Sequence, residues 1–422
     1  MTGSDPRGRP RQAVIVAGGR GTRLGPLTED RPKALVEVAG RPFLDHLVGS
    51  IQRRGFDRIL LLLGYRAEQV QRHVDSVDGW GAEVTCVATD PADETATRFR
   101  AAEAHIDPRF LFLYCDNLWP MPFDAMWSRY AAAGASAMVT VYANDDGFTR
   151  DNVRVGDDGL VEVYDRTREA AGLRGVEIGY GIFERDELAR LGDVDRSFQD
   201  ALYPGLIAER RLHAWVTAHR YYSIGKPERL EATAAYVSGP PTVIVDRDGV
   251  LNEKAPRAEY VRSWAEWRWI PGALEALALL RSAGYRVIVV SNQAGIARGA
   301  MRRADLDAIH ERMRADVAAH GGRIDDIYVC PHDWDEGCAC RKPKPGMLLA
   351  AQRDHALDLT RTPFIGDDER DGEAAAAAGA PSILVSGPDG LLRAVEGVLA
   401  DTAVTHAGDR APGRRTPAGV GR

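Results

Sequence analysis

Short apolar segments alternate with amphipathic segments along almost the whole of this 422-residue sequence. The apolar segments have the length of strands, and the segments between them have the length and periodicity of helices. Such alternation predicts an α/β fold with parallel sheets that are covered by helices on both faces. In a sheet of this kind, ligands bind at the carboxyl ends of the strands, so the residues that follow each strand are the first candidates for function.

The strands fall into two series, one in each half of the chain. The first series is predicted at residues 13–17, 58–63, 83–88, 110–115 and 137–142, and the second at 242–245, 286–290, 327–330, 363–365 and 382–385. Helices are predicted at 43–54, 272–283, 303–320, 346–355 and 371–378. The string "VSGPPT" separates the two series, because glycine and proline together mark a boundary. We predict one domain over residues 10–237, a second over 241–400, and a disordered tail rich in Gly, Pro and Arg over 405–422.

The composition is that of a globular protein with sizeable cores. Hydrophobic residues make up 45% of the chain and charged residues 27%. The formal net charge of −7 argues against a general nucleic-acid-binding protein. No apolar run approaches the roughly 18 residues of a membrane span, and the polar N-terminus lacks a signal-peptide core. We therefore expect a cytoplasmic protein that binds neither nucleic acid nor membrane; its oligomeric state stays open.

A glycine-rich loop follows the first predicted strand. Gly18, Gly19 and Gly21 let the backbone approach a ligand closely and direct amide groups at it. Arg23 and Lys33 add positive charge near the same strand end. These features suit a nucleoside triphosphate whose pyrophosphate leaves during a reaction. The loop fits neither the P-loop nor the dinucleotide-binding pattern.

The string "GGRGTRLGPLTEDRPKAL" resembles the signature of the sugar-phosphate nucleotidylyltransferases, and the resemblance spans most of residues 12–236. This family joins a nucleoside triphosphate to a sugar 1-phosphate and releases pyrophosphate. The resemblance implies a Rossmann-like nucleotidyltransferase fold, with the three glycines binding the nucleotide. It also implies that Arg23 contacts the leaving phosphates and that Lys33 positions the reacting ones. Asp116, which closes the strand in "FLYCDN", matches the aspartate with which the family binds Mg²⁺.

Three segments depart from the pattern of that family. Ser223 in "SIGKPE" replaces a second metal-binding aspartate, and a hydroxyl is a poorer Mg²⁺ ligand than a carboxylate. The base-recognition segment reads "ETAT" at residues 94–97. The string "DRT" at 165–167 replaces E-K-P, whose lysine meets the sugar phosphate, so Arg166 would have to supply that charge. An alternative is therefore a domain that binds a nucleotide sugar without turning it over.

In the second domain, the string "PTVIVDRDGVLNEK" ends an apolar strand with Asp246 and Asp248. Aspartate at a strand end can simply open a turn or cap a helix. Polar residues also follow three other segments of this domain: Ser291 and Asn292 in "VSNQAG", Arg341 and Lys342 in "CRKPKPG", and Asp367 and Asp371 in "FIGDDERDG". If the strands are parallel neighbours, all these groups meet at one edge. Carboxylates packed so closely require a cation, and Mg²⁺ prefers oxygen ligands of this kind.

This set of residues predicts a phosphoryl-transfer site. Asp246 would attack phosphorus and form an aspartyl-phosphate. Asp248 would protonate the leaving alkoxide and then activate water. Ser291 and Asn292 would hold phosphate oxygens, and Lys342 would orient the nucleophile and the phosphate.

The Mg²⁺ ion of this site would bind Asp246, Asp248 and Asp367, with Asp371 supporting that shell. The order D-x-D-G-V/T, S/T-N, K-P and G-D-x-x-x-D resembles the haloacid dehalogenase (HAD) superfamily of phosphatases over about residues 241–395. The resemblance implies a HAD-like Rossmannoid fold for the second domain.

Four side chains that commonly bind metals cluster just before the lysine motif: Cys330, His332, Cys338 and Cys340. In a cytoplasmic chain such clustering favours a metal over a disulfide. Three thiolates and one imidazole make a closed tetrahedral Zn²⁺ site of the structural kind. Zinc would tie a loop that lacks its own core and aim Arg341 and Lys342 at the active site. The alternative is a set of free thiols beside a surface histidine.

The C-x-H…C-x-C pattern before R-K-P, together with "SNQAGIARG", resembles the D-glycero-D-manno-heptose 1,7-bisphosphate 7-phosphatases and the related histidinol-phosphate phosphatases. Arg298 and Arg341 are candidate substrate contacts. The two resemblances imply consecutive steps: loss of the 7-phosphate, then nucleotidyl transfer to heptose 1-phosphate, with GTP as the donor by analogy with heptose guanylyltransferases. The alternative is a histidinol-phosphate or other small phosphomonoester phosphatase, fused to a nucleotide-sugar-binding module.

Overall fold

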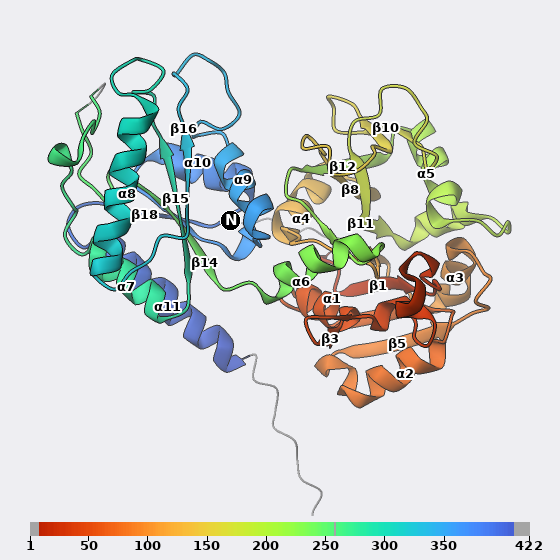
Figure 1. Cartoon of the computed structure of the whole chain (residues 1–422). Coiled ribbons are helices and arrows are strands. Elements are labelled where there is room, and N and C mark those ends of the chain that lie inside the picture. The colour runs from red at the N-terminus through yellow and green to blue at the C-terminus, as the bar shows by residue number, and fades with distance from the viewer. Residues whose placement is uncertain (1–7, 257–258, 409–422) are drawn as a thin grey trace, which may run out of the picture. The chain divides into compact units, whose positions relative to one another are not determined.

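The computed structural model describes residues 8–256 and 259–408. It separates into two compact units, Met1–Gly239 and Pro240–Arg422, each built around its own β-sheet (Figure 1). Most of the tail predicted to be disordered, residues 409–422, lies outside the described residues. Within the described part of the chain, no helix combines the length and the apolar character that a bilayer crossing requires.

The first unit contains a seven-stranded sheet with the order β12-β8-β11-β6-β1-β4-β5. Its strands are β1 (Gln12–Ala17), β4 (Arg58–Leu63), β5 (Glu83–Ala88), β6 (Arg109–Tyr114), β8 (Ala137–Tyr142), β11 (Val176–Glu184) and β12 (Leu212–Thr217). Short strands form three two-stranded ladders: β2 (Glu37–Val38) with β3 (Arg41–Pro42), β7 (Asn117–Leu118) with β13 (Tyr222–Ser223), and β9 (Val153–Val155) with β10 (Val161–Tyr164).

Helices cover both faces of this sheet. They are α1 (Phe43–Gln52), α2 (Ala67–Ser76), α3 (Thr95–Ala102), α4 (Phe123–Ala132), α5 (Phe198–Ala208) and α6 (Leu230–Ser238). Along β1, Ala13 and Ile15 belong to the core that α1, α2 and α4 cover, whereas Val14 and Val16 belong to the core that α3 and α5 cover. This alternation follows from the two-residue period of a strand, and it explains why every residue of β1 is buried.

The sheet of the first unit is mixed, whereas strand–helix alternation predicts a parallel one. β11 runs antiparallel to both of its neighbours, β6 and β8. The chain between β8 and β11 contains the short strands β9 and β10 and no α-helix. A crossover helix is what a parallel return requires, so its absence is consistent with the antiparallel direction.

The second unit contains a five-stranded sheet, parallel throughout, with the order β16-β15-β14-β17-β18. Its strands are β14 (Thr242–Asp246), β15 (Arg286–Asn292), β16 (Asp326–Cys330), β17 (Phe364–Gly366) and β18 (Ser382–Leu384). Its helices are α7 (Ala273–Ser282), α8 (Arg303–Ala319), α9 (Gly346–His355), α10 (Glu369–Ala378) and α11 (Gly390–Gly408). The α/β class predicted for this half is confirmed, and each predicted strand is present with bounds that differ by at most two residues at an end.

The central position of β14 determines which side chains can meet. β14 lies between β15 and β17, so Asp246 at its carboxyl end has the ends of those two strands beside it. Buried apolar residues of β14, α7 and α8 form the core on one face, and α9 and α10 pack on strands from the other. The polar residues that follow the strands therefore converge on one edge of a rigid sheet.

Candidate active sites

The candidate site of the second unit is centred on a buried lysine. The Nζ atom of Lys342 lies 2.8 Å from Oδ1 of Asp246 and 2.7 Å from Oδ1 of Asp371. All three side chains are buried. Burial raises the pKa of Asp246 to about 7, because Lys342 offsets only part of the desolvation and Asp371 adds negative charge. One ammonium group is thus shared between two carboxylates.

Asp367 completes an acidic cluster at this strand edge. Asp246, Asp367 and Asp371 each offer a carboxylate oxygen, and these oxygens lie within 4.8 Å of one another. Oδ2 of Asp367 accepts a hydrogen bond from Lys254 at 2.8 Å, but its buried Oδ1 has no partner among the described residues. A buried carboxylate oxygen without a donor, beside two other carboxylates, fits a hard divalent cation such as Mg²⁺. A Cβ at Gly249 would lie 2.2 Å from Asp367, so only glycine leaves room for this arrangement.

Asp248 lies outside that acidic cluster. Its two oxygens accept hydrogen bonds from Nη2 of Arg247 at 2.9 and 2.8 Å, and it also accepts from Asn252 at 2.9 Å and Gln293 at 2.7 Å. Burial raises the pKa of Asp248, but Arg247 and these amide groups outweigh burial and lower the pKa below its usual value. The structure therefore groups Asp371, rather than the predicted Asp248, with Asp246 and Asp367.

The two residues predicted to hold phosphate both line the cavity above Asp246, which has a volume of about 620 Å³. Asn292, however, is also tied to the main chain of the lysine loop. Its amide donates to the carbonyl of Lys342 at 3.2 Å and accepts from the Lys342 N–H at 3.1 Å. Ser291 accepts a hydrogen bond from Gln293 at 2.8 Å. Asn292 thus fixes Lys342 as well as facing the cavity.

The two candidate arginines lie in different environments. Arg341 lines the cavity, whereas Arg298 is not among its lining residues. The guanidinium of Arg298 donates to Asp333 at 2.8 Å and lies 3.9 Å from the ring centroid of Trp334. Arg298 therefore braces the segment that carries His332, and the exposed Trp334 is the residue of this pair that faces the cavity.

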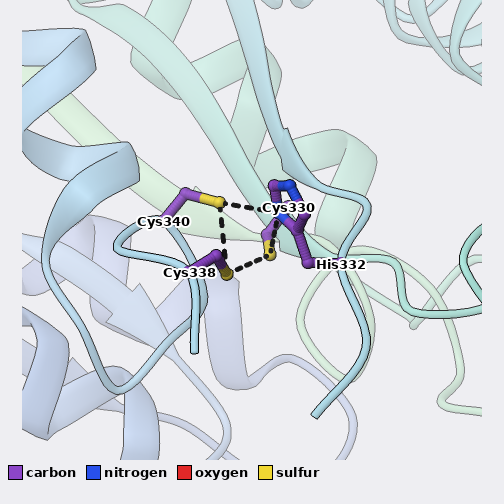
Figure 2. A group of neighbouring side chains, drawn as sticks. All are labelled: Cys330, His332, Cys338 and Cys340. Carbon is purple, nitrogen blue, oxygen red and sulfur yellow. Dashed lines mark hydrogen bonds between the residues drawn. The ribbon is translucent and has the colours of Figure 1, made fainter. Parts of the chain in front are cut away.

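The cysteine–histidine cluster has the dimensions of a tetrahedral metal site (Figure 2). The Sγ atom of Cys338 lies 3.7 Å from that of Cys330 and 3.6 Å from that of Cys340. Nδ1 of His332 lies 3.6 Å from Cys330 and 3.2 Å from Cys340. Zinc bonds of ordinary length predict edges of about 3.8 Å between sulfurs and about 3.6 Å between sulfur and nitrogen. The four side chains therefore fit zinc at close to the observed spacing.

In the first unit, the glycine loop is supported by a buried arginine. A Cβ at Gly18 would lie 2.6 Å from Cζ of Arg98, which comes from α3. The guanidinium of Arg98 donates to the carbonyl of Leu63 at 2.6 Å and to that of Asp93 at 2.8 Å. Gly18 must lack a side chain because Arg98 occupies that space. Gly21 has a positive φ of 72° and begins the 3₁₀ helix η1 (Thr22–Thr28).

The candidate catalytic groups of the first unit meet around Gly225. Nζ of the buried Lys33 lies 2.5 Å from Oδ2 of Asp116, and a Cβ at Gly225 would lie 3.2 Å from Oγ of Ser223. Among the described residues, no three metal-ligating side chains converge on Asp116. One carboxylate that is already paired with an ammonium does not fit the two-aspartate Mg²⁺ site that the family pattern implies.

Three of the remaining predicted residues have less support from their contacts. Arg23 and Gly19 are exposed. Arg166 pairs with Asp200 at 3.1 Å, so its positive charge is already partly neutralised. The part of the site that is built into the fold therefore consists of Gly18, Gly21 and Lys33 together with Asp116.

Comparison with known proteins assigns the two units to two families. Residues 12–151 match the family model described as nucleotidyl transferase, and residues 339–391 match the one described as HAD-hydrolase-like. The D-glycero-beta-D-manno-heptose-1,7-bisphosphate 7-phosphatase of Pseudomonas putida is 45% identical over 162 residues, which cover 38% of this chain and 91% of that protein. The chain belongs, through its second unit, to this phosphatase family. The prediction of a nucleotidyl transferase domain followed by a HAD-type phosphatase is confirmed.

Solved structures resemble each unit separately. D,D-heptose 1.7-bisphosphate phosphatase from B. bronchiseptica, complexed with magnesium and phosphate, is 40% identical with a TM-score of 0.36, and the match covers 38% of this chain and 98% of that one. HddC from Yersinia pseudotuberculosis, complexed with GMP-PN, is 22% identical with a TM-score of 0.47, and the match covers 53% of this chain and 98% of that one.

Several contacts in the phosphatase unit were not anticipated from its sequence. Lys254 and Arg370 line the cavity, and Gln293 holds Asp248. Lys254 and Gln293 stand within strings that the sequence motifs include, so their proximity to the site could have been inferred. Arg247 gives no such signal, because an arginine between two aspartates would ordinarily be expected to reach solvent.

Proposed function

We propose that this chain is a bifunctional enzyme of sugar-nucleotide synthesis. The phosphatase unit hydrolyses the 7-phosphate of D-glycero-D-manno-heptose 1,7-bisphosphate. The nucleotidyl transferase unit then joins a nucleotide, from GTP by analogy with other heptose guanylyltransferases, to the heptose 1-phosphate that remains, and pyrophosphate leaves. The observation that carries the proposal is the buried cluster of Asp246, Lys342 and Asp371 at the edge of a HAD-type sheet, in a chain closely similar to heptose bisphosphate phosphatases.

The proposed chemistry uses two carboxylates, an ionised Asp246 as the nucleophile and a protonated Asp248 as the acid. The negative charge of a bound phosphate would favour the protonated form of Asp248, against the lowering of its pKa by Arg247. An oxygen of Asp246 attacks phosphorus, the bond between phosphorus and the sugar oxygen breaks, and Asp248 gives that oxygen a proton. A water molecule then attacks the aspartyl-phosphate, Asp248 takes a proton from it, and phosphate leaves Asp246 regenerated. Lys342 holds Asp246 and offsets charge on the phosphate oxygens. The cavity over these groups supports a small sugar phosphate as substrate.

Two metal ions belong to the proposal. Asp246, Asp367 and Asp371 would hold Mg²⁺, which supplies charge neutralisation for the phosphate oxygens. Cys330, His332, Cys338 and Cys340 would hold a structural Zn²⁺. Thiolate ligands and nucleoside triphosphates are both found in a reducing compartment, so we also propose that the protein is cytoplasmic.

A substrate panel tests the phosphatase assignment. We expect phosphate release from heptose 1,7-bisphosphate with kcat/KM at least about 100-fold above that for histidinol phosphate, because a second phosphate adds charge that Lys254, Arg341 and Arg370 around the cavity can bind. The product should retain its 1-phosphate, as measured by phosphorus NMR. Faster hydrolysis of histidinol phosphate would replace the heptose assignment with the second candidate.

Ser223 permits a test of the nucleotidyl transferase unit. Replacing Ser223 with aspartate adds the missing carboxylate beside Asp116, so we expect the Mg²⁺ concentration for half-maximal pyrophosphate release to fall by roughly tenfold. Ser223→Asn is the matched control, since it has the same size but no charge. Tight nucleotide binding without pyrophosphate release from any sugar 1-phosphate, in wild type and variant alike, would instead identify this unit as a binding module.

A further inference from the structure

Arg247 separates Asp246 from Asp248 in the chain, yet its side chain is only 1% exposed. Its Nη2 donates to both oxygens of Asp248, at 2.9 and 2.8 Å. Its Nη1 lies 3.2 Å from Nε2 of His310, a buried residue of α8. A buried arginine is rare unless it is paired, and this one is paired with the residue proposed to move protons.

We propose that Arg247 and His310 are positioning residues that hold Asp248 in place for both proton transfers of the phosphatase. The proposal rests on the hydrolytic function proposed above. Neither side chain has a hydrogen bond to Asp246, Asp367 or Asp371; it is the main-chain N–H of Arg247 that donates to Asp246, at 2.7 Å. His310 is absent from the lining of the cavity, whereas Arg247 is part of it. The polar ends of both side chains are directed to Asp248, either directly or through one another, so substitutions of these side chains test Asp248 while the main-chain contact to Asp246 stays.

His310 can take only one role in this contact. A guanidinium has donors and no acceptor, so Nε2 of His310 must accept and the ring proton must sit on Nδ1. Burial lowers the pKa of His310 to about 3, with the charge of Arg247 as the next cause, so the ring is neutral. A neutral acceptor at this point fixes the second nitrogen of the guanidinium and thereby its plane.

The other contacts of Arg247 do not define its orientation as well. Its guanidinium lies 5.8 Å from the ring centroid of Trp267, a distance near the outer limit of a cation–π contact. Its Nε is buried and has no partner among the described residues. The carbonyl of Arg247 accepts from the N–H of Asn252 at 3.1 Å, and the side chain of Asn252 in turn donates to Asp248 at 2.9 Å. The side chain of Arg247 thus holds the carboxylate of Asp248 directly, and its main chain does so through Asn252.

The consequence for the reaction depends on the leaving group. A sugar oxygen must receive a proton as its bond to phosphorus breaks, whereas p-nitrophenolate leaves without one. A loosely held Asp248 therefore slows formation of the aspartyl-phosphate from a sugar phosphate but not from p-nitrophenyl phosphate. Hydrolysis of the aspartyl-phosphate also needs Asp248, so it slows with both substrates.

The test compares substitutions at both residues, with heptose 1,7-bisphosphate and p-nitrophenyl phosphate as substrates. For Arg247→Met and His310→Met we expect kcat for the sugar phosphate to fall by about 100-fold and about tenfold respectively, with KM unchanged. With p-nitrophenyl phosphate the same variants should show a rapid burst of p-nitrophenolate followed by a slow steady state. His310→Gln, which keeps an acceptor, should restore most of the rate. His320→Met, just beyond α8, is the matched control.

A uniform structural effect gives a different pattern. Loss of rate without a burst of p-nitrophenolate, together with a raised KM, would overturn the proposal, as would a failure of His310→Gln to exceed the rate of His310→Met. Thermal unfolding identifies variants that fail to fold. If Arg247→Met is one of them, the comparison of the rates of His310→Met and His310→Gln decides the question. If the wild-type enzyme does not hydrolyse heptose bisphosphate, the heptose assignment fails. The comparison of variants is then made with an alkyl phosphate that the enzyme does hydrolyse, so the inference about Arg247 and His310 is tested separately.

Discussion

Replacing Asp246 with asparagine lowers phosphate release by at least about 10³-fold, because the amide cannot attack phosphorus and no aspartyl-phosphate forms. The fold should survive. Asparagine has nearly the same shape, and Lys342 keeps its contact with Asp371 at 2.7 Å. This substitution can therefore remove catalysis without removing the fold.

The stability of this variant should increase near neutral pH in metal-free buffer. Burial raises the pKa of Asp246 from 3.8 to about 7 in the folded protein, so the folded state binds a proton more tightly than the unfolded state. A raised carboxyl pKa destabilises the folded state above the unfolded value, and the loss is greatest once the pH exceeds the folded value. Asparagine carries no such penalty, so the melting temperature of the variant should lie above that of wild type at pH 8, and the difference should vanish towards pH 4.

The measurements are phosphate release and thermal unfolding, each made with EDTA-treated and Mg²⁺-loaded protein. Asp335→Asn, at an exposed carboxylate in the loop of the cysteine–histidine cluster, is the matched control and should leave phosphate release unchanged. Pyrophosphate release by the first unit in the same sample serves as an internal check on the preparation. Phosphate release within tenfold of wild type would exclude Asp246 as the nucleophile.

The phosphatase unit was largely predictable because its signals are local. Each strand is a short apolar run with a functional residue at its carboxyl end. Asp246 is the last residue of β14, Ser291 lies near the end of β15, and Asp367 directly follows β17. Parallel neighbours bring such residues to one edge whatever the loops between them do. What the sequence could not give is the pairing between distant segments, such as Arg247 with His310 or Asn292 with the main chain of Lys342.

The nucleotidyl transferase unit was less predictable, and for physical reasons. β11 contains Gly179 and Gly181, which interrupt the apolar alternation that indicates a strand. Its antiparallel direction could not be inferred without knowing that no helix connects it to β8. Arg98 lies in an otherwise ordinary amphipathic helix, where an arginine is expected to reach solvent, yet it supports Gly18 from beneath. The motifs identified this unit in spite of these features.

The loop that carries Lys342 is the part of the phosphatase unit with the least core of its own. Between Pro331 and Pro345, Lys342 is the only buried residue among those described. Cys330 ends β16, and Cys338 and Cys340 stand just before Lys342. A metal bound by these thiolates and His332 would therefore tie the lysine loop to the sheet, in place of the apolar packing that the loop lacks.

Replacing Cys338 with serine should abolish both zinc binding and phosphatase activity. Serine is a poor zinc ligand, and structural zinc sites contribute on the order of 10 kcal/mol to folding of the segment that holds them. Without the ion the loop keeps the two hydrogen bonds with Asn292 but loses its tie to the end of β16. Lys342 is then held less firmly at Asp246, and we expect phosphate release to fall at least about 100-fold. Zinc content by mass spectrometry should fall from one equivalent per chain to none.

The control for this experiment is Cys86→Ser, since Cys86 is half-buried in the first unit and belongs to no metal-ligating group among the described residues. It should keep one equivalent of zinc and full phosphatase activity. Removal of zinc from wild type by a strong chelator should reproduce the Cys338→Ser result, and added Zn²⁺ should restore wild type but not the variant. Full activity in wild-type protein that contains no zinc would mean that the four side chains hold the loop by their own hydrogen bonds, because Lys342 would then keep its place without an ion.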